Sequence, residues 1–127
     1  MKYVMLICRD EPAWSKLDLS EQQRIYAETL ALAEELTARG QYLGGTPLYP
    51  SSSATSVRVR DGKRLVTDGP FAETREQLGG FMIVDVKDLD EAIAIAARIP
   101  LARTSTVEIR PVREGQPTAE ERASPRA

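Results

Sequence analysis

The stretch VRVRDGKRLVT, residues 57–67, decides how the rest of the sequence is organised. Apolar and basic residues alternate up to Arg60, Asp61-Gly62 is the signal of a two-residue type I′ turn, and an extended run follows to Thr67. This pattern predicts a β-hairpin. Because the sequence on each side of it reads as strand, helix and strand, we expect the hairpin to be an insertion between two similar halves.

The half before the hairpin begins with an apolar run that predicts a buried strand. Ser20 and Gln23 have the spacing of a capping box, and Gly40 stands where a helix commonly ends. The elements expected here are a strand at residues 3–8, a loop at 10–19, a helix at 21–38 and a bent strand at 41–50.

The half after the hairpin repeats this order. Asp88 is expected to cap a helix with Glu91 at its third position, and Pro100 is expected to end it. The elements expected here are a loose helical turn at residues 72–78, a strand at 81–86, a helix from 89 onward and a strand at 106–112.

This order of elements predicts an α+β fold of the ferredoxin-like βαβ-βαβ plan with an inserted hairpin. We expect one domain over residues 1–112. Residues 113–127 hold no large apolar side chain and contain Pro117 and Pro125. We expect them to be a disordered tail.

Composition excludes several classes of protein. The chain has 127 residues, with 17 Lys and Arg against 19 Asp and Glu, and a net charge of -2. It therefore lacks the long-range positive electrostatic field that would attract nucleic acid or an anionic membrane. It has no histidine, which removes His-containing triads and His-ligated zinc, and Cys8 has no partner for a disulfide. No membrane span or signal peptide is recognisable, so we expect a cytoplasmic protein.

The predicted sheet is expected to need a second subunit to cover one of its two faces. Both helices of this plan fall on one face of the sheet, and a strand with one wet face normally alternates apolar and polar residues. Residues 3–8 and 81–84 are apolar on both faces. Leaving six to eight such side chains in water costs on the order of 10 kcal/mol, at ~1.5–3 kcal/mol each. We therefore expect a homodimer with its open faces packed together as a shared α/β barrel; the alternative is that the hairpin or the tail folds over that face.

The tetrapeptide Asp68-Gly69-Pro70-Phe71 has two interpretations. As a turn, Asp and Gly shape the bend, Pro fixes the exit and Phe fills the core. As a site, the rigid turn presents the Asp68 carboxylate, with Glu73 nearby, as a general acid or base at the mouth of a ligand pocket. Acidic residues this close in sequence also suit Mg²⁺, but that signal is weak, and we expect neither a metal nor an organic cofactor.

Other candidate residues have simpler explanations. The basic tip formed by Arg58, Arg60, Lys63 and Arg64 is expected to be a solvated edge, and it lacks the aromatic residues that nucleic-acid binding requires. Tyr42 is expected as packing or as part of the pocket mouth. Cys8 is expected to be an inert thiol, and Thr29 a core hydroxyl bonded to its own helix.

Residues 65–74 (LVTDGPFAET) and 76–81 (EQLGGF) resemble the signature of the DGPF branch of the YCII-related proteins. Residues 1–3, 54–58 and 107–112 also resemble it, so the likeness spans nearly the whole domain. The resemblance implies a dimeric α/β barrel of ferredoxin-like subunits in the bacterial cytoplasm, often encoded beside an extracytoplasmic-function sigma factor.

The resemblance implies no defined activity. In the wider family a His–Asp pair has been suggested as a catalytic dyad, and those positions fall on Thr29 and Ile99 here, which cannot do that chemistry. Three hypotheses follow, with enzymatic activity left open. The chain is a dimer that binds or converts a small molecule near Asp68, Glu73 and Tyr42; or it is a regulatory module that docks on a sigma factor through the hairpin; or the motif serves only to build the dimer.

Overall fold

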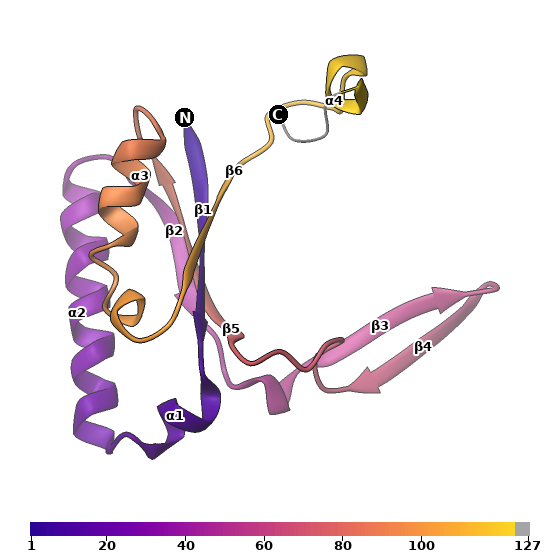
Figure 1. Cartoon of the computed structure of the whole chain (residues 1–127), viewed down its shortest axis with the longest axis horizontal. Coiled ribbons are helices and arrows are strands. Elements are labelled where there is room, and N and C mark those ends of the chain that lie inside the picture. The colour runs from indigo at the N-terminus through magenta and orange to yellow at the C-terminus, as the bar shows by residue number, and fades with distance from the viewer. Residues whose placement is uncertain (124–127) are drawn as a thin grey trace.

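A four-stranded antiparallel sheet with the strand order β2-β5-β1-β6 forms the centre of the fold (Figure 1). The structure is a computed structural model, and it describes residues 1–123. The four strands are β1 (Lys2–Arg9), β2 (Tyr42–Pro47), β5 (Gln77–Asp85) and β6 (Val107–Pro111). The chain is thus a mixed α+β protein, and no closed barrel occurs within residues 1–123.

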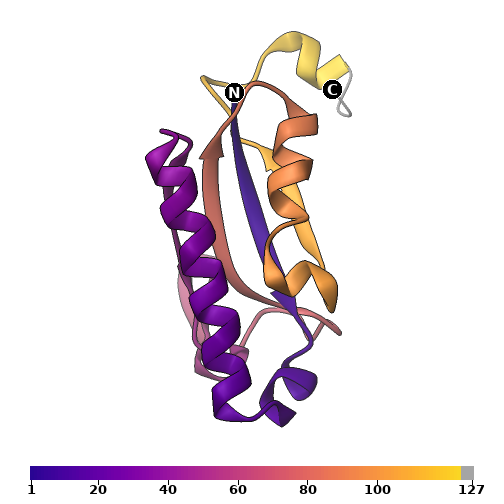
Figure 2. The same cartoon turned by 90° about the vertical axis from the view of Figure 1, so that its left-hand side faces the viewer.

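Helices α2 (Leu19–Ala38) and α3 (Leu89–Ala96) cover one face of this sheet, as Figure 2 shows. The shorter helical elements are α1 (Glu11–Lys16), η1 (Ser51–Ser53), η2 (Pro100–Arg103) and α4 (Ala119–Ala123). No helix among residues 1–123 combines the length and the apolar character that crossing a bilayer requires.

The core lies between these two helices and the sheet. Side chains on β1 alternate between fully buried and half-buried, because successive residues of a strand point to opposite faces. The largest fully buried side chains come from β1, α2, β5 and the turn before η2, and are Met5, Leu36, Val84 and Ile99.

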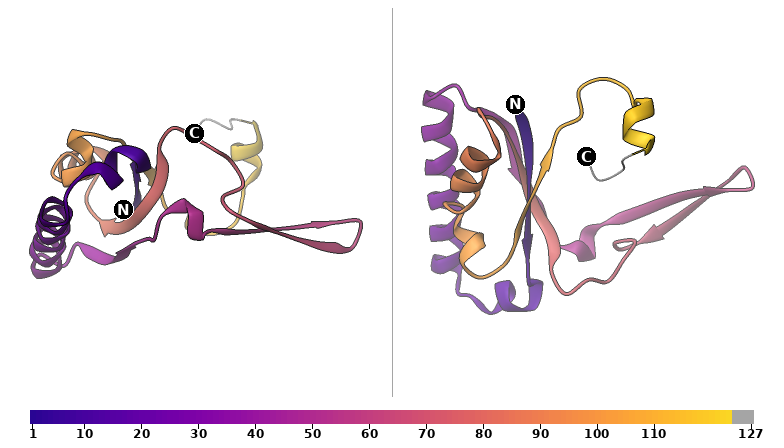
Figure 3. Two further views of the ribbon diagram at one scale, coloured as in Figure 1. Left: turned by 90° about the horizontal axis from the view of Figure 1, so that it is seen from below. Right: turned by 45° about the horizontal axis from the view of Figure 1, so that its top comes forward.

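The opposite face of the sheet carries no helix. We call it the helix-free face and define it by Val4, Leu6, Phe81 and Ile83, which pair across β1 and β5 and stay half-buried. The hairpin does not fold over this face but extends away from it (Figures 1 and 3). Within the described residues, the helix-free face is therefore open.

The hairpin predicted at residues 57–67 is confirmed as β3 (Thr55–Arg60) and β4 (Lys63–Asp68), which form a separate two-stranded sheet. Asp61 and Gly62 have φ values of 51° and 73°, as a type I′ turn requires. We call residues 55–68 the arm. Every one of its residues except Ser56 is exposed.

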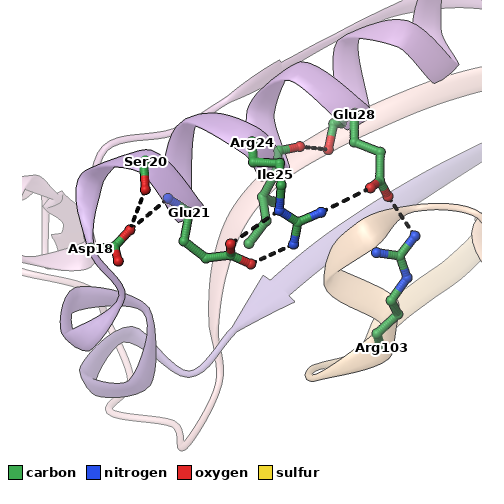
Figure 4. A network of polar contacts seen from close by, with 8 residues as sticks. Asp18, Ser20, Glu21, Arg24, Ile25, Glu28 and Arg103 are labelled. Carbon is green, nitrogen blue, oxygen red and sulfur yellow. Dashed lines mark hydrogen bonds and ion pairs between the residues drawn. The ribbon is translucent and has the colours of Figure 1, made fainter.

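Helix α2 begins earlier than its sequence pattern indicated. The expected cap, Ser20, lies inside the helix, and Asp18 is the N-cap, accepting hydrogen bonds from the Glu21 backbone N–H and the Ser20 hydroxyl at 2.8 Å each. A carboxylate has two acceptor oxygens and a full charge at the positive end of the helix, so it outcompetes the hydroxyl. Figure 4 shows this cap and the ion pairs that follow it along α2.

The prediction of a loop over residues 10–19 was wrong in part, because residues 11–16 form α1. Asp10 caps this helix through the Ala13 N–H at 3.0 Å, and Pro12 lies in its first turn, where a missing N–H costs no hydrogen bond. A proline is therefore as compatible with the start of a helix as with a loop.

In the second half, the N-cap of α3 is confirmed: Asp88 accepts from the Glu91 N–H at 2.9 Å. The helix ends at Ala96, before Pro100, which begins η2. The expected helical turn at residues 72–78 is absent, because β5 already begins at Gln77. Its early start extends the strand toward the end of β1 that carries Arg9.

The tail predicted over residues 113–127 is described only in part. Residues 119–123 form the short helix α4, and Arg113 forms an ion pair with Glu121 at 2.7 Å. Residues 124–127 lie outside the described residues. The division into a domain at 1–112 and a disordered tail stays a prediction.

Candidate functional site

A cavity of about 300 Å³ lies between the middle of α2 and the helix-covered face of the sheet. Its walls come from β1, α1, α2, β2, β5 and η2, and include Trp14, Ile25, Leu30, Tyr42, Met82 and Leu101. This size is at the lower end of the range of about 300–1,000 Å³ that is usual for small-molecule sites. Most of the lining is apolar, so the cavity suits a compact ligand with an apolar body.

One charged side chain, Arg9, lines this cavity and is only 3% exposed. It ends β1 on the same side of the strand as Ile7, which directs it toward the core. Gly79 on the neighbouring strand makes room for it, because a Cβ atom there would lie 3.0 Å from Arg9 Nε. A buried guanidinium is expensive, by several kcal/mol, unless it is paired.

The pairing of Arg9 is incomplete. Its Nη2 donates to the Leu48 carbonyl at 3.3 Å, and the guanidinium carbon lies 4.8 Å from the centre of the Trp14 ring. Nε is buried with no hydrogen-bond partner, and no carboxylate pairs with Arg9 within residues 1–123. The cation–π contact offsets part of the loss of hydration, but the charge has no counter-ion.

Helix α1 positions Trp14 at the edge of the cavity. The Trp14 ring packs edge-to-face against Tyr26 of α2, with ring centres 5.8 Å apart. The Gln22 side chain donates to the Trp14 carbonyl at 2.9 Å, which ties α1 to the start of α2. The indole that stacks on Arg9 is therefore held from two sides.

A second, more polar hollow of about 640 Å³ adjoins the cavity. We call it the polar hollow; it is lined by α1, η1 and the segment before β5, and shares only Arg9 and Trp14 with the apolar cavity. Glu11, one of its acids, accepts hydrogen bonds from both the backbone N–H, at 2.7 Å, and the hydroxyl of Ser51. Arg9 thus stands at the boundary between an apolar and a polar space.

The motif residues do not gather at these spaces. Asp68 is exposed at the end of β4, Phe71 is 82% exposed, and none of residues 68–71 lines either the cavity or the polar hollow. Gly69 has a φ of 99°, donates to the Ala54 carbonyl at 2.6 Å and accepts from Ser56, so the turn is tied to the start of β3. Pro70 is half-buried.

The other two predicted site residues are separated from each other. Glu73 lines the polar hollow and Tyr42 lines the apolar cavity. The structure therefore does not bring Asp68, Glu73 and Tyr42 together around one space. A carboxylate site at the motif stays a prediction.

Two positions singled out by the family resemblance do line the apolar cavity. Thr29 lies there with its hydroxyl donating to the Ile25 carbonyl at 2.9 Å, as expected for a hydroxyl bonded to its own helix. Ile99 lies on the η2 side of the same cavity.

Cys8 faces away from this cavity, since it alternates with Ile7 and Arg9 along β1. It is half-buried, and burial, together with the nearby charges of Glu76 and Glu108, raises the pKa of its thiol. This agrees with the expectation of an unreactive thiol. No group of three or more potential metal ligands occurs among residues 1–123.

Sequence reasoning missed Arg9 and Trp14. Arg9 directly follows the apolar run of residues 3–8, and a charged residue at that position is typical of the end of a buried strand. The signal that could have identified it is the alternation Tyr3, Met5, Ile7, Arg9, which places the guanidinium on the core side.

Comparison with known proteins gives three findings. The YCII-related domain matches residues 1–116. "Uncharacterized protein R00369" of Rhizobium meliloti (strain 1021) is 35% identical over 114 residues, which are 88% of this chain and 92% of that protein. A solved structure of 5-chloro-2-hydroxyhydroquinone dehydrochlorinase (TftG) from Burkholderia phenoliruptrix AC1100, in complex with 2,5-dihydroxybenzoquinone, is similar at 19% identity and a TM-score of 0.48, covering 91% of this chain and 96% of that one.

Proposed function

The chain belongs to the YCII-related domain family, and from this premise we propose that it is a homodimeric protein that binds a small molecule between α2 and the sheet. The observation that carries the proposal is the apolar cavity of about 300 Å³ with a single buried cation at its edge. A core that served stability alone would close around such a space, because empty volume lowers stability. The location we propose for the protein is the cytoplasm.

A ferredoxin-like subunit is the second part of the proposal. The order β2-β5-β1-β6, with both long helices on one face, supports it. This plan leaves the opposite face of the sheet without cover, and Val4, Leu6, Phe81 and Ile83 form an apolar surface there. A second copy packed on the helix-free face, giving a shared α/β barrel, would remove that surface from water.

The arm supports an assembly for an independent reason. In its register Val57 lies opposite Val66, and Val59 lies on the same side, while Arg58 and Leu65 share the other side. Both Val57 and Val66 are more than half exposed, at 60% and 58%. A two-stranded ribbon with an uncovered apolar side is marginally stable by itself. We propose that the valine side of the arm contacts the partner subunit.

A thermal-shift screen of the full chain against small organic molecules tests the binding site. Compounds that occupy the cavity should stabilise the wild type and Asp68→Asn, but not Ala33→Trp, whose indole fills the cavity from α2. Leu30→Trp at the exposed rim replaces Ala33→Trp if the latter does not fold. If compounds still stabilise Ala33→Trp but no longer stabilise Asp68→Asn, they bind at the motif and not in the cavity, with Asp68 and Glu73 as the carboxylates of the site. If no compound stabilises the wild type and Asp68→Asn melts much earlier, the motif is scaffolding and the binding proposal fails.

Analytical ultracentrifugation tests the assembly. The wild type should sediment as a dimer, and Ile83→Asp on the helix-free face should sediment as a monomer. Ile93→Asp is the matched control, because Ile93 is an exposed isoleucine of α3 on the other side of the molecule. A wild type that stays monomeric at micromolar concentration would remove this part of the proposal.

A second candidate function is a regulatory module that docks on an extracytoplasmic-function sigma factor. The observation that favours it is the basic side of the arm, where Arg58, Arg60 and Lys63 project together. Under this hypothesis, co-purification with a sigma factor should be lost in the variant carrying both Arg58→Glu and Arg60→Glu. The small-molecule proposal predicts that the same double variant keeps its ligand.

A further inference from the structure

We propose that the ligand of the apolar cavity is a small carboxylate with a branched or aromatic body, and that Arg9 binds its carboxylate group. This inference rests on the proposed function, since it names the chemical class of the ligand for that cavity. The juxtaposition that carries it is a buried, unpaired guanidinium at the boundary between an apolar cavity and the polar hollow.

Arg9 keeps its charge under all ordinary conditions, because an arginine does not lose its proton in proteins. Its one protein hydrogen bond goes to a neutral acceptor, the Leu48 carbonyl, and Nε has no acceptor. An anion bound beside the guanidinium would supply the missing counter-charge and a charged hydrogen-bond acceptor. A planar carboxylate matches the planar fork of an arginine, because its two oxygens can accept two parallel N–H hydrogen bonds.

The two acids that follow Arg9 in the chain are engaged elsewhere, and Glu73, the third acid lining the polar hollow, is exposed and forms no ion pair with Arg9. The Asp10 carboxylate caps α1 through the Ala13 N–H at 3.0 Å. The Glu11 carboxylate is held by the backbone N–H and hydroxyl of Ser51. Satisfying Arg9 with either acid would break a cap or a loop anchor, so the chain leaves the position of the counter-ion open.

The surroundings of Arg9 define the rest of the ligand. On one side lies the apolar cavity, whose volume of about 300 Å³ suits a body of one ring or a short branched chain. Trp14 closes the edge next to the guanidinium, so an aromatic body would also contact the indole. A second charged group on the ligand would have no partner in this lining and would lose its hydration there.

Trp14 provides the readout, because it is the only tryptophan of the chain and stacks on Arg9. The full-length protein is titrated with benzoate, phenylacetate and 4-methylpentanoate, and in parallel with the three corresponding primary amides, which have nearly the same shape and no charge. We expect saturable changes in Trp14 fluorescence, with each carboxylate binding at least tenfold more tightly than its amide.

The variants separate the role of Arg9 from general electrostatic attraction. Arg9→Gln should abolish the tenfold preference while apolar bodies still bind. Arg75→Gln is the matched control, since Arg75 is exposed and lines only the polar hollow; it should keep the preference. Arg9→Met, an apolar side chain of similar length, should melt at a higher temperature than the wild type, which shows that a loss of binding is not a loss of folding.

The outcomes distinguish this inference from the proposed function. If carboxylates and amides bind equally, and Ala33→Trp blocks both, the cavity binds ligands but the assignment to Arg9 is overturned. If the preference survives Arg9→Gln, the assignment is also overturned. If none of the six probes binds to the wild type, the carboxylate class is rejected, while the broader compound screen decides separately whether the cavity binds anything.

Discussion

The four-stranded sheet and the arm are both antiparallel and both carry alternate apolar side chains, yet only the sheet buries them. On β1 every second side chain is buried beneath α2 or α3, whereas the valines of the arm are exposed on β3 and β4. Local turn geometry alone shapes the arm, while the sheet is held by packing. The difference shows that in this chain a correct strand pattern does not by itself imply a buried strand.

The largest expected contrast comes from truncating one side chain in each region. Leu36 is 0% exposed, and Leu36→Ala should lower the free energy of unfolding by about 2–5 kcal/mol, because it removes buried methyl groups and leaves a cavity. Val66→Ala in the arm should change it by less than about 0.5 kcal/mol in dilute protein, as expected for an exposed position. Chemical denaturation of both variants measures this contrast. A loss at Val66 as large as at Leu36 would mean that the arm is packed even in dilute solution.

Substituting alanine for Gly45 or for Gly62 should be destabilising, for a different physical reason at each position. A Cβ atom at Gly45 would lie 2.4 Å from the Phe81 carbonyl oxygen, so Gly45→Ala forces β2 away from β5 and should cost about 1–3 kcal/mol of global stability. A Cβ atom at Gly62 would meet no atom within 4 Å, but the φ of this residue is 73°, so Gly62→Ala strains only the turn, by about 1–2 kcal/mol.

Thermal melting and hydrogen exchange separate the two effects. Gly45→Ala should lower the melting temperature of the whole domain. Gly62→Ala should leave the melting temperature nearly unchanged and speed amide exchange in β3 and β4 alone. A global loss from Gly62→Ala would show that the arm folds together with the sheet.

The smallest expected effect concerns the start of α2. The hydrogen bond from the Glu21 backbone N–H, with a further one from the Ser20 hydroxyl, lowers the pKa of the Asp18 carboxyl. The stabilisation is therefore fully present above the unfolded pKa of about 3.9 and is lost as the pH falls through the lower folded value. Asp18→Ala should lower the melting temperature at neutral pH, and the difference from wild type should shrink below about pH 4.

Ser20→Ala is the control for this prediction, because Ser20 was the cap expected from the sequence pattern. It should lower the melting temperature less than Asp18→Ala does. The opposite ranking in melts recorded at pH 7 would restore Ser20 as the cap.

The parts of the fold that were predictable are those set by local chemistry. Asp61-Gly62 fixed the hairpin because few residue pairs accept positive φ at both turn positions. Asp88 fixed the start of α3 for a similar reason. Helix α1 was missed because Pro12 suits both a loop and a first helical turn, and only the Asp10 cap distinguishes the two.

Only two of the residues that line the candidate site were predictable from the sequence. Tyr42 and Glu73 each line one of the two spaces, but the cation between them was not identified. The burial of Arg9 depends on Gly79, which comes from a distant part of the sequence and lies beside it only after β1 and β5 pair. No local pattern around Arg9 encodes that contact.

The position of Cys8 allows chemical labelling to report whether the helix-free face is covered. It is the only thiol of the chain, and it lies on the side of β1 away from the helices, next to Leu6. The raised pKa makes its alkylation slow at neutral pH and faster in alkali, but a reagent can still approach while the face is bare. Iodoacetamide labelling of Cys8 over a dilution series would then measure how much of the sheet is shielded, without any amino-acid substitution.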